Sequence, residues 1–217
     1  MKTRAFYILL TDLIHSKVLA NRQEATRAIK KAITKVNDRF AKDMYAPMEI
    51  TRGDETAAVL TSLNQLYDFL VYYLNELQPF RFRIVVTHGL LTAGIHDRKS
   101  AEMDGPGFYM ADETMRQLKK TRKLFQLKTD KNDYDTMVTG LINLLLFRRD
   151  QLTDFQLSVA ELYGKGMTQR EIAKKLKRTP QQVSQAIKAI PCDVYDEAEH
   201  AVRLLLKNLN SSLRKYA

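Results

Sequence analysis

The strongest constraint on the fold is the order in which strand and helix patterns follow one another before residue 130 of this 217-residue chain. Residues 6–10 form an unbroken apolar run, which is typical of a central strand covered on both faces. Residues 23–40 repeat their apolar positions at helical spacing, with Lys and Arg on the other side. The same reading predicts strands at 48–51, 56–60 and 82–87, and a helix at 62–77. The resulting order is β-α-β-β-α-β.

This order predicts an α+β domain built on a ferredoxin-like split βαβ unit. Another strand is predicted at 90–93, after the His88-Gly89 pair, a third helix begins near Pro106, and 124–127 forms an edge strand. From Tyr134 onward only helical patterns follow. We therefore predict an α+β domain at 1–132 followed by an all-α domain at 133–217.

Composition and charge narrow the classes of partner. The formal net charge of +10 favours polyanions, with nucleic acid first and free nucleotides second. The single cysteine excludes an intrachain disulfide and fits a reducing compartment. The first apolar run is too short for a signal peptide core or a membrane span. A cytoplasmic protein with no membrane partner is therefore predicted.

Two helix-start signals follow each other closely near the carboxy-terminal end. Thr168 and Glu171 have the spacing of a capping box, in which each side chain bonds the other residue's backbone N–H. Thr179 and Gln182 repeat that spacing, with Pro180 at the first helical position. The pattern predicts a helix-turn-helix at 152–190. It resembles the DNA-binding helices of response regulators and of the last region of bacterial sigma factors.

The second of these helices has the chemistry for reading double-stranded DNA. Its buried stripe would leave Gln181, Gln185 and Lys188 on the opposite face, where glutamine can pair with adenine and lysine can reach guanine or phosphate. The alternative is a small helical module that only packs or dimerises, with solvated basic residues. Basic residues predicted to neutralise phosphates are Arg170, Lys174, Lys175, Lys177 and Arg178.

Two aspartates at strand ends form a candidate metal pair. Asp12 follows the apolar strand at 6–10, and Asp54 lies on the Gly53-Asp54 turn between two later strands. If these strands are neighbours, both carboxylates reach one rim of the sheet, where they would hold Mg²⁺ or Mn²⁺ with a nucleoside triphosphate. The alternative is that Asp12 only ends a strand and Asp54 only supplies turn chemistry.

Three landmarks resemble those of class III nucleotide cyclases in their order: Thr11-Asp12-Leu13-Ile14, Arg52-Gly53-Asp54, and Ile84-Val85-Val86-Thr87-His88-Gly89 with Gly94. With the helix-turn-helix added, the chain is identified as a member of the SatD family. The resemblance implies a nucleotide-cyclase or palm-like domain in which two aspartates hold metal ions. It also implies phosphate contacts near Leu13, Ser16, Lys17 and Arg52.

The resemblance is incomplete at three positions. Cyclases carry Asn and, four residues on, Arg to orient the ribose and stabilise the transition state, whereas this chain has Tyr109 and Glu113. A lysine used in adenine recognition is replaced by Ile50. Losing the arginine would cost several kcal/mol of transition-state stabilisation. No catalytic residue is therefore assigned, and turnover is not expected from the sequence.

The main functional prediction is a DNA-binding transcriptional regulator whose cyclase-like domain senses a nucleotide or metal, or dimerises. The alternative is an active metal-dependent nucleotidyl cyclase or nucleotidyltransferase. A third possibility is a purely structural dimerisation domain joined to the DNA-binding helices. A homodimer is predicted because cyclase-type sites are shared between subunits in the families that the chain resembles. A helical stripe offers a second self-complementary surface: Val202, Leu205, Leu209 and Leu213.

Overall fold

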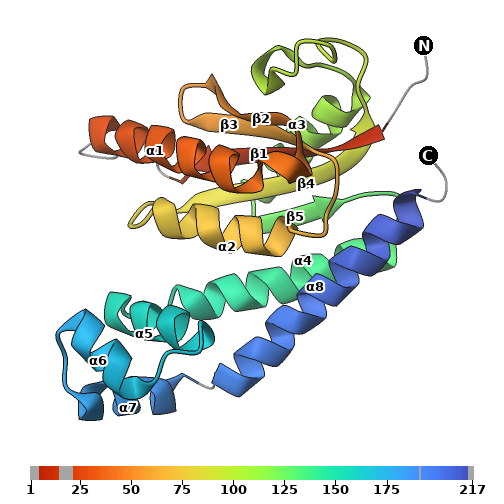
Figure 1. The fold of residues 1–217 in the computed structure, drawn as a ribbon. Coiled ribbons are helices and arrows are strands. Elements are labelled where there is room, and N and C mark those ends of the chain that lie inside the picture. Colours follow the sequence, from red (N-terminus) through yellow and green to blue (C-terminus); the bar gives the residue numbers. More distant parts are fainter. Residues whose placement is uncertain (1–4, 15–21, 191, 215–217) are drawn as a thin grey trace. The chain divides into compact units, whose positions relative to one another are not determined.

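The computed structural model describes residues 5–14, 22–190 and 192–214 (Figure 1). The chain divides into two compact units. Unit 1 comprises Met1–Gly140 and Arg203–Ala217, and unit 2 comprises Leu141–Val202. Unit 1 holds the whole sheet, whereas unit 2 is helical. The predicted mixed sheet with flanking helices is therefore present.

The sheet has five strands with β1 at its centre. Antiparallel neighbours flank β1 on both sides, and β5 extends the sheet as a parallel partner of β4. The first four strands have the order of a split βαβ unit, as predicted. Across the sheet the strands are β2 (Met44–Arg52), β3 (Glu55–Leu60), β1 (Ala5–Leu13), β4 (Phe82–Leu90) and β5 (Phe125–Lys128).

Helices cover both faces of the sheet. Helices α1 (Arg22–Phe40) and α2 (Leu66–Glu76) lie on one face, and α3 (Pro106–Leu118) lies on the other (Figure 1). Two short 3-10 turns, Ala41–Asp43 and Ser100–Glu102, precede β2 and α3. The unbroken apolar run of β1 follows from this layering, since its alternate side chains enter two different cores.

The alternation along β1 fixes which residues face which layer. Phe6 and Ile8 belong to the core cluster that includes Phe108 of α3. Thr11, at an odd position, hydrogen-bonds Thr56 on β3, and Thr56 in turn contacts the Tyr73 hydroxyl of α2. Even-numbered residues of β1 therefore face α3, and odd-numbered ones face α1 and α2.

The two strands predicted around His88-Gly89 are a single strand, which corrects that prediction. Strand β4 pairs with β1 without interruption as far as Leu90, opposite Ala5. Beyond β4, Ala93 forms only an isolated bridge with Asp104. Gly89 continues the strand because its missing side chain lets α3 approach. A Cβ there would lie 2.6 Å from the Gly107 Cα.

Side chains of α4 (Asn132–Arg149) form hydrogen bonds with strand β5 at the edge of the sheet and with the segment that follows it. The Leu127 amide donates to Thr139 Oγ1 at 3.0 Å, so a backbone N–H of the edge strand is not left open. Just before the helix, the Thr129 amide and hydroxyl donate to the two carboxylate oxygens of Asp135. These contacts tie the start of α4 to the sheet.

The last part of helix α8 (Cys192–Arg214) belongs to unit 1. The buried Asn210 accepts hydrogen bonds from the Tyr7 hydroxyl at 3.1 Å and from the Leu63 amide at 3.2 Å. Arg203 pairs with Asp68 at 2.8 Å. The bounds of the compact units therefore differ from the predicted division at residue 132, because this carboxy-terminal segment satisfies polar groups in unit 1.

Unit 2 is built on short helices with reciprocal caps. The predicted capping boxes of Thr168 with Glu171 and of Thr179 with Gln182 are both present, and Thr153 with Gln156 adds a third. Lys177 makes the turn with a left-handed backbone, φ 52°. The helices are α5 (Asp154–Gly164), α6 (Gln169–Leu176) and α7 (Pro180–Ala189). Their shared core comprises Val159, Leu162, Ile172, Ala173, Val183 and Ala186.

None of the described helices combines the length and the apolar character that a membrane crossing requires.

Partial burial of His88 predicts a pH-dependent stability. The centre of its ring lies 4.8 Å from the centre of the Tyr7 ring. Burial lowers the pKa of His88 below the ordinary 6.5, and this effect outweighs the negative charge of Asp130, which raises the pKa. The pKa of His88 is therefore lower in the folded protein than in the unfolded chain. The stability that the neutral His88 ring contributes is fully present above pH 6.5 and is lost as the pH falls through the folded pKa.

We expect His88→Gln to weaken this loss. Melting temperatures of the wild type and variant, compared between about pH 7.5 and about pH 5.5, measure the effect. The wild type should lose more stability than the variant on acidification. The exposed His200, changed to Gln, is the matched control. Equal pH dependence in the wild type and His88→Gln would contradict the assignment.

Candidate functional site

The strand register brings the two candidate aspartates to the same end of the sheet. Strands β1 and β3 are neighbours, with Thr11 opposite Thr56 and their hydroxyl oxygens 2.8 Å apart. Asp12 follows Thr11 on β1, and Asp54 lies two residues before Thr56, in the turn between β2 and β3. The condition on which the candidate pair depends, that the two strands are neighbours, is therefore met.

Asp12 is buried in a cluster of opposite charges on the α3 face. Its carboxylate lies 2.7 Å from the Lys119 ammonium and 3.6 Å from the Arg83 guanidinium, which stands opposite it on β4. The same ammonium lies 3.3 Å from Glu55. Asp12 has an even number on β1, so its side chain faces α3, whose carboxy-terminal cap is Lys119. Both of its oxygens therefore have a cationic neighbour.

The charge state of Lys119 follows from these contacts. Burial by itself lowers the pKa of Lys119, but the hydrogen bond to Asp12 and the charges of Asp12 and Glu55 outweigh it, so the net pKa is raised. Lys119 is therefore a cation at neutral pH. Its positive charge and that of Arg83 balance the acidic groups of this cluster.

Asp54 has a different environment. One of its carboxylate oxygens, Oδ2, is buried and has no hydrogen-bond partner among the residues that the structure describes. The residue lines a hollow of about 180 Å³ between the end of β1, the β2–β3 turn and the first turns of α1. The hollow is lined by Leu13, Arg22, Ala25, Thr26, Ile29, Gly53 and Asp54.

The two carboxylates differ in how well they fit a divalent cation. A buried carboxylate oxygen without a partner costs about 1–3 kcal/mol, so Asp54 is suited to a cation that supplies the missing interaction. Asp12 does not fit in the same way, because Lys119 and Arg83 already occupy its oxygens. Among the residues that the structure describes, no three His, Cys, Asp or Glu side chains gather as a metal site.

The residues predicted to contact phosphate lie partly at this hollow. Leu13 lines it, whereas Arg52 is exposed at the end of β2, paired with Glu55 in the hairpin register. Ser16 and Lys17 lie outside the described residues. Arg22 was not singled out from the sequence, yet it lines the hollow at the start of α1. A helix start favours anions, and an arginine there adds a positive charge.

Tyr109 and Glu113, which replace the cyclase Asn and Arg, both have local partners. The Tyr109 hydroxyl donates to Asp104 at 3.0 Å, and this hydrogen bond raises the pKa of Tyr109. Glu113 pairs with Arg116 and accepts from Gln117 at 3.0 Å. Neither side chain supplies the positive charge that the cyclase arginine would bring.

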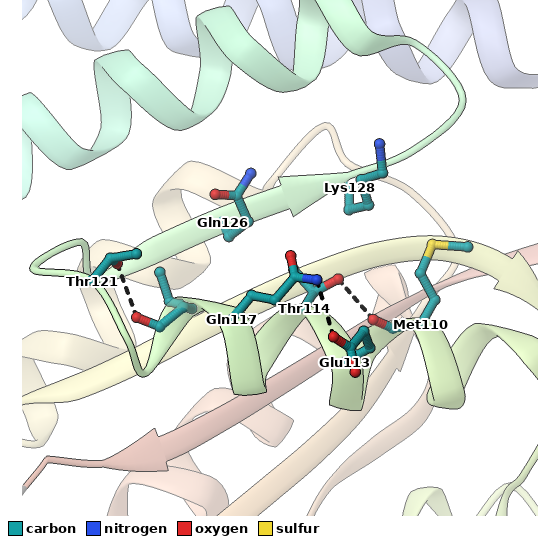
Figure 2. A pocket seen from close by; sticks show the side chains of 8 residues that line it. Met110, Glu113, Thr114, Gln117, Thr121, Gln126 and Lys128 are labelled. Atoms are coloured by element: carbon teal, nitrogen blue, oxygen red, sulfur yellow. Dashed lines mark hydrogen bonds between the residues drawn. The ribbon is translucent and has the colours of Figure 1, made fainter.

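Glu113 also lines a second hollow, of about 380 Å³, between α3 and β5 (Figure 2). Polar side chains along its α3 wall are satisfied by neighbours on the same segment. The Thr114 hydroxyl donates to the Met110 carbonyl, and the Thr121 hydroxyl donates to the Leu118 carbonyl. The wall formed by β5 contributes Gln126 and Lys128. Lys128 donates to Asn132 at 3.2 Å. The polar groups described here already have partners within the chain.

The eight residues predicted to contact DNA are all exposed on α6, α7 and the turn between them. The Arg178 guanidinium lies over the Phe155 ring, 5.7 Å from its centre. Basic residues on any solvated surface are exposed in the same way, so their exposure does not distinguish a DNA-binding surface. The geometry of unit 2 therefore gives no separate indication of a DNA contact.

Three charged residues around Asp12 were missed by reasoning from the sequence: Arg83, Lys119 and Glu55. Arg83 interrupts an apolar strand, and the β1–β4 register would have placed it beside Asp12. Glu55 directly follows the Gly-Asp turn. Lys119 has no local motif, and only the packing of α3 against β1 brings it to Asp12.

Solved structures similar to this chain include nucleotide cyclase domains. They include a bacterial light-regulated adenylyl cyclase, at 13% identity and TM-score 0.39, covering 58% of this chain and 77% of that one. A rhodopsin-guanylyl cyclase catalytic core, solved with ATPalphaS, matches at 15% identity and TM-score 0.43 over the same shares of the two chains. Adenylyl cyclase CyaB from P. aeruginosa matches at 11% identity and TM-score 0.40, covering 54% and 74%.

The prediction of a DNA-binding transcriptional regulator is corrected by these comparisons. The structures that match include adenylyl and guanylyl cyclases rather than DNA-binding regulators, and the likeness is one of fold. The helix-turn-helix signature misled because two capped helices with a short turn and exposed positive charge also describe an ordinary small helical unit.

No curated protein matches this chain. The model of the SatD family matches residues 6–206, which is most of the chain and includes parts of both units. The identification made from the cyclase-like landmarks and the helical segment is thereby confirmed: the chain belongs to the SatD family.

Proposed function

We propose that this protein binds a nucleoside triphosphate together with a divalent cation at the hollow beside Asp54, and that it catalyses a nucleotidyl cyclase or nucleotidyltransferase reaction. The observation that carries the proposal is the buried, unpartnered Oδ2 of Asp54 in a hollow that also has Arg22 on its wall. A carboxylate and an arginine in one small hollow match the two parts of a cation–triphosphate complex.

Asp54 would hold the cation. Mg²⁺ is commonly bound through one or two carboxylates plus substrate phosphates and water rather than by a cage of protein ligands alone. A single available carboxylate is therefore sufficient when a triphosphate supplies the other oxygens. When bound, the cation would neutralise phosphate charge and polarise the phosphorus that is attacked.

Arg22 and the start of α1 would hold the triphosphate. Arg22 is exposed and lies in the first turn of a 19-residue helix, where backbone N–H groups and the helix dipole favour an anion. Together they would fix the triphosphate for attack at its α-phosphorus, with pyrophosphate as the leaving group. Holding the reacting groups in place is the larger part of catalysis in phosphoryl and nucleotidyl transfer.

Pyrophosphate release tests this function. The full-length protein is incubated with Mn²⁺ and each of the four common ribonucleoside triphosphates in turn, and the products are separated. We expect pyrophosphate with at least one of them, accompanied by a cyclic nucleotide or a nucleotidylated acceptor. Binding without any pyrophosphate would leave only a nucleotide sensor, and no binding to any of them would contradict the proposal.

The predicted homodimer would need a different surface from the helical stripe first considered. Val202, Leu209 and Leu213 of that stripe are buried within the chain. Tyr109 on α3 is 60% exposed and Leu90 at the end of β4 is 40% exposed. These two elements meet where Gly107 of α3 lies against the backbone of Gly89 and Leu90. We therefore propose that self-association uses this region.

Sedimentation velocity at micromolar concentration measures this self-association. The wild type is expected to sediment as a dimer and Tyr109→Ala as a monomer, because an exposed aromatic residue is a common anchor of an interface. Tyr163→Ala, an exposed aromatic substitution in unit 2, serves as the control and should remain dimeric. A monomeric wild type would rule out the dimer.

A further inference from the structure

Asp12 is a buried carboxylate whose negative charge is balanced by two cationic side chains of the same chain. A buried carboxylate without a counter-charge is strongly unfavourable. Asp12 is 8% exposed, and its oxygens face the Lys119 ammonium at 2.7 Å and the Arg83 guanidinium at 3.6 Å. The chain therefore provides its own counter-charges at the position where the cyclase resemblance would put a metal ion.

Lys119 connects three elements of unit 1 through one ammonium group. It caps α3 at its carboxy-terminal end, and its ammonium contacts both Asp12 of β1 and Glu55 of β3. Three elements of unit 1 thus meet at one positive charge. By comparison, the neighbouring Lys120 is exposed.

The contacts of Lys119 have the pattern of a cation bound between two carboxylates. An ammonium group carries one positive charge and can donate three hydrogen bonds. Its donation to one oxygen of Asp12 and one of Glu55 satisfies two of them. A divalent ion at the same carboxylates would have to displace it and would also meet the positive charge of Arg83.

We propose that Lys119 is a positioning and specificity-determining residue that replaces a metal ion at Asp12, so that the site uses a single divalent cation, at Asp54. This inference rests on the proposed function for the Asp54 cation, but the assignment of Lys119 to Asp12 stands on the ion-pair geometry alone. Lys119 would then supply the second positive charge at this end of the sheet. It would also hold α3 against β1 and β3.

The first experiment tests Lys119 without any nucleotide. All proteins carry Asp54→Asn, so that added Mn²⁺ reports on Asp12 alone, and thermal melting is measured with and without Mn²⁺. Mn²⁺ should leave the parent unchanged, whereas adding Lys119→Met should lower the melting temperature by several degrees and create a stabilising response to Mn²⁺. Adding Asp12→Asn as well should remove that response. Lys120→Met is the matched control and should behave as the parent.

Two results of this first experiment would overturn the proposal. One is a parent protein that Mn²⁺ stabilises through Asp12, seen as a response that Asp12→Asn removes. The other is Lys119→Met without any response to Mn²⁺. If that variant fails to fold, the variant that also carries Asp12→Asn removes both charges, and recovery of its melting temperature shows that the two groups are coupled.

The second experiment counts cations on the protein with its native Asp54. Electron paramagnetic resonance measures bound Mn²⁺ in the presence of a non-hydrolysable nucleoside triphosphate. We expect one Mn²⁺ per bound triphosphate for the wild type and two for Lys119→Met. Two for the wild type would refute the role of Lys119. A wild type that binds no triphosphate would refute the proposed function instead, and the melting experiment would still decide on Lys119.

Discussion

Replacing Gly89 by alanine is expected to destabilise the protein by about 3 kcal/mol or more, which is at the upper end of overpacking effects. A Cβ at this position would lie 2.6 Å from the Cα and 3.2 Å from the amide nitrogen of Gly107. Both are backbone atoms at the start of α3, so no side chain can rotate away to relieve the clash. Helix α3 would have to move off the sheet.

Two further glycine substitutions give this prediction a graded series. In Gly107→Ala the closest atom is the end of the Ile8 side chain, also at 2.6 Å, which can shift, so a smaller loss is expected. Gly140→Ala meets nothing within 4 Å in the middle of α4 and should stabilise by up to about 1 kcal/mol. Urea denaturation measures all three. Equal stability of Gly89→Ala and the wild type would contradict the close approach of α3 to β4.

The second large effect is expected from Asp54→Asn, and it should have opposite signs with and without ligand. Without ligand, the substitution removes a buried carboxylate whose Oδ2 has no partner within the described parts of the chain, so stability should stay the same or increase. With Mn²⁺ and a non-hydrolysable triphosphate, the wild type should gain about 2.7 kcal/mol at a ligand concentration of about one hundred times the dissociation constant. The variant should gain almost nothing.

The expected loss of affinity in Asp54→Asn is at least about 100-fold, since removing groups that merely support a metal ligand already costs about 10–100-fold. Calorimetric titration measures it directly. Asp38→Asn, an exposed substitution at the other end of α1, is the matched control and should bind as the wild type. Undiminished binding by Asp54→Asn would place the cation elsewhere.

The fold was predictable wherever one segment's own pattern decides its structure. The apolar run of β1, the apolar stripe of α1 and the caps at Thr168 and Thr179 each signal their element locally, and each is present in the structure. The break at His88-Gly89 was predicted wrongly because glycine in a strand looks the same whether it ends the strand or admits a neighbouring helix. Only the position of Gly107, in contact across the two elements, distinguishes these cases.

The candidate site was less predictable because its properties depend on contacts between distant segments. The two aspartates were found from their strand-end positions, and the register of β1 with β3 brings their strands together. The difference between them could not be read from the sequence. Asp12 is balanced by Lys119, more than one hundred positions later, and that pairing depends on how α3 packs on the sheet.

The division into units was also beyond local patterns. The apolar stripe of α8 predicted a buried face but not what would bury it. The hydrogen bonds of Asn210 to Tyr7 and Leu63 assign the end of α8 to unit 1, and they join residues from opposite ends of the chain. A helical stripe of this kind fits self-association and intramolecular packing equally well.

The most direct test of the account is an anomalous diffraction map from crystals of the full chain grown with Mn²⁺ and a non-hydrolysable nucleoside triphosphate. We predict one manganese peak beside the Asp54 carboxylate, with the triphosphate next to Arg22 and no peak at Asp12. A manganese pair bridging Asp12 and Asp54 would retain the nucleotide function but reject the role of Lys119. A map with triphosphate and manganese elsewhere, or with neither bound, would contradict the central claim that this end of the sheet binds a cation and a nucleotide.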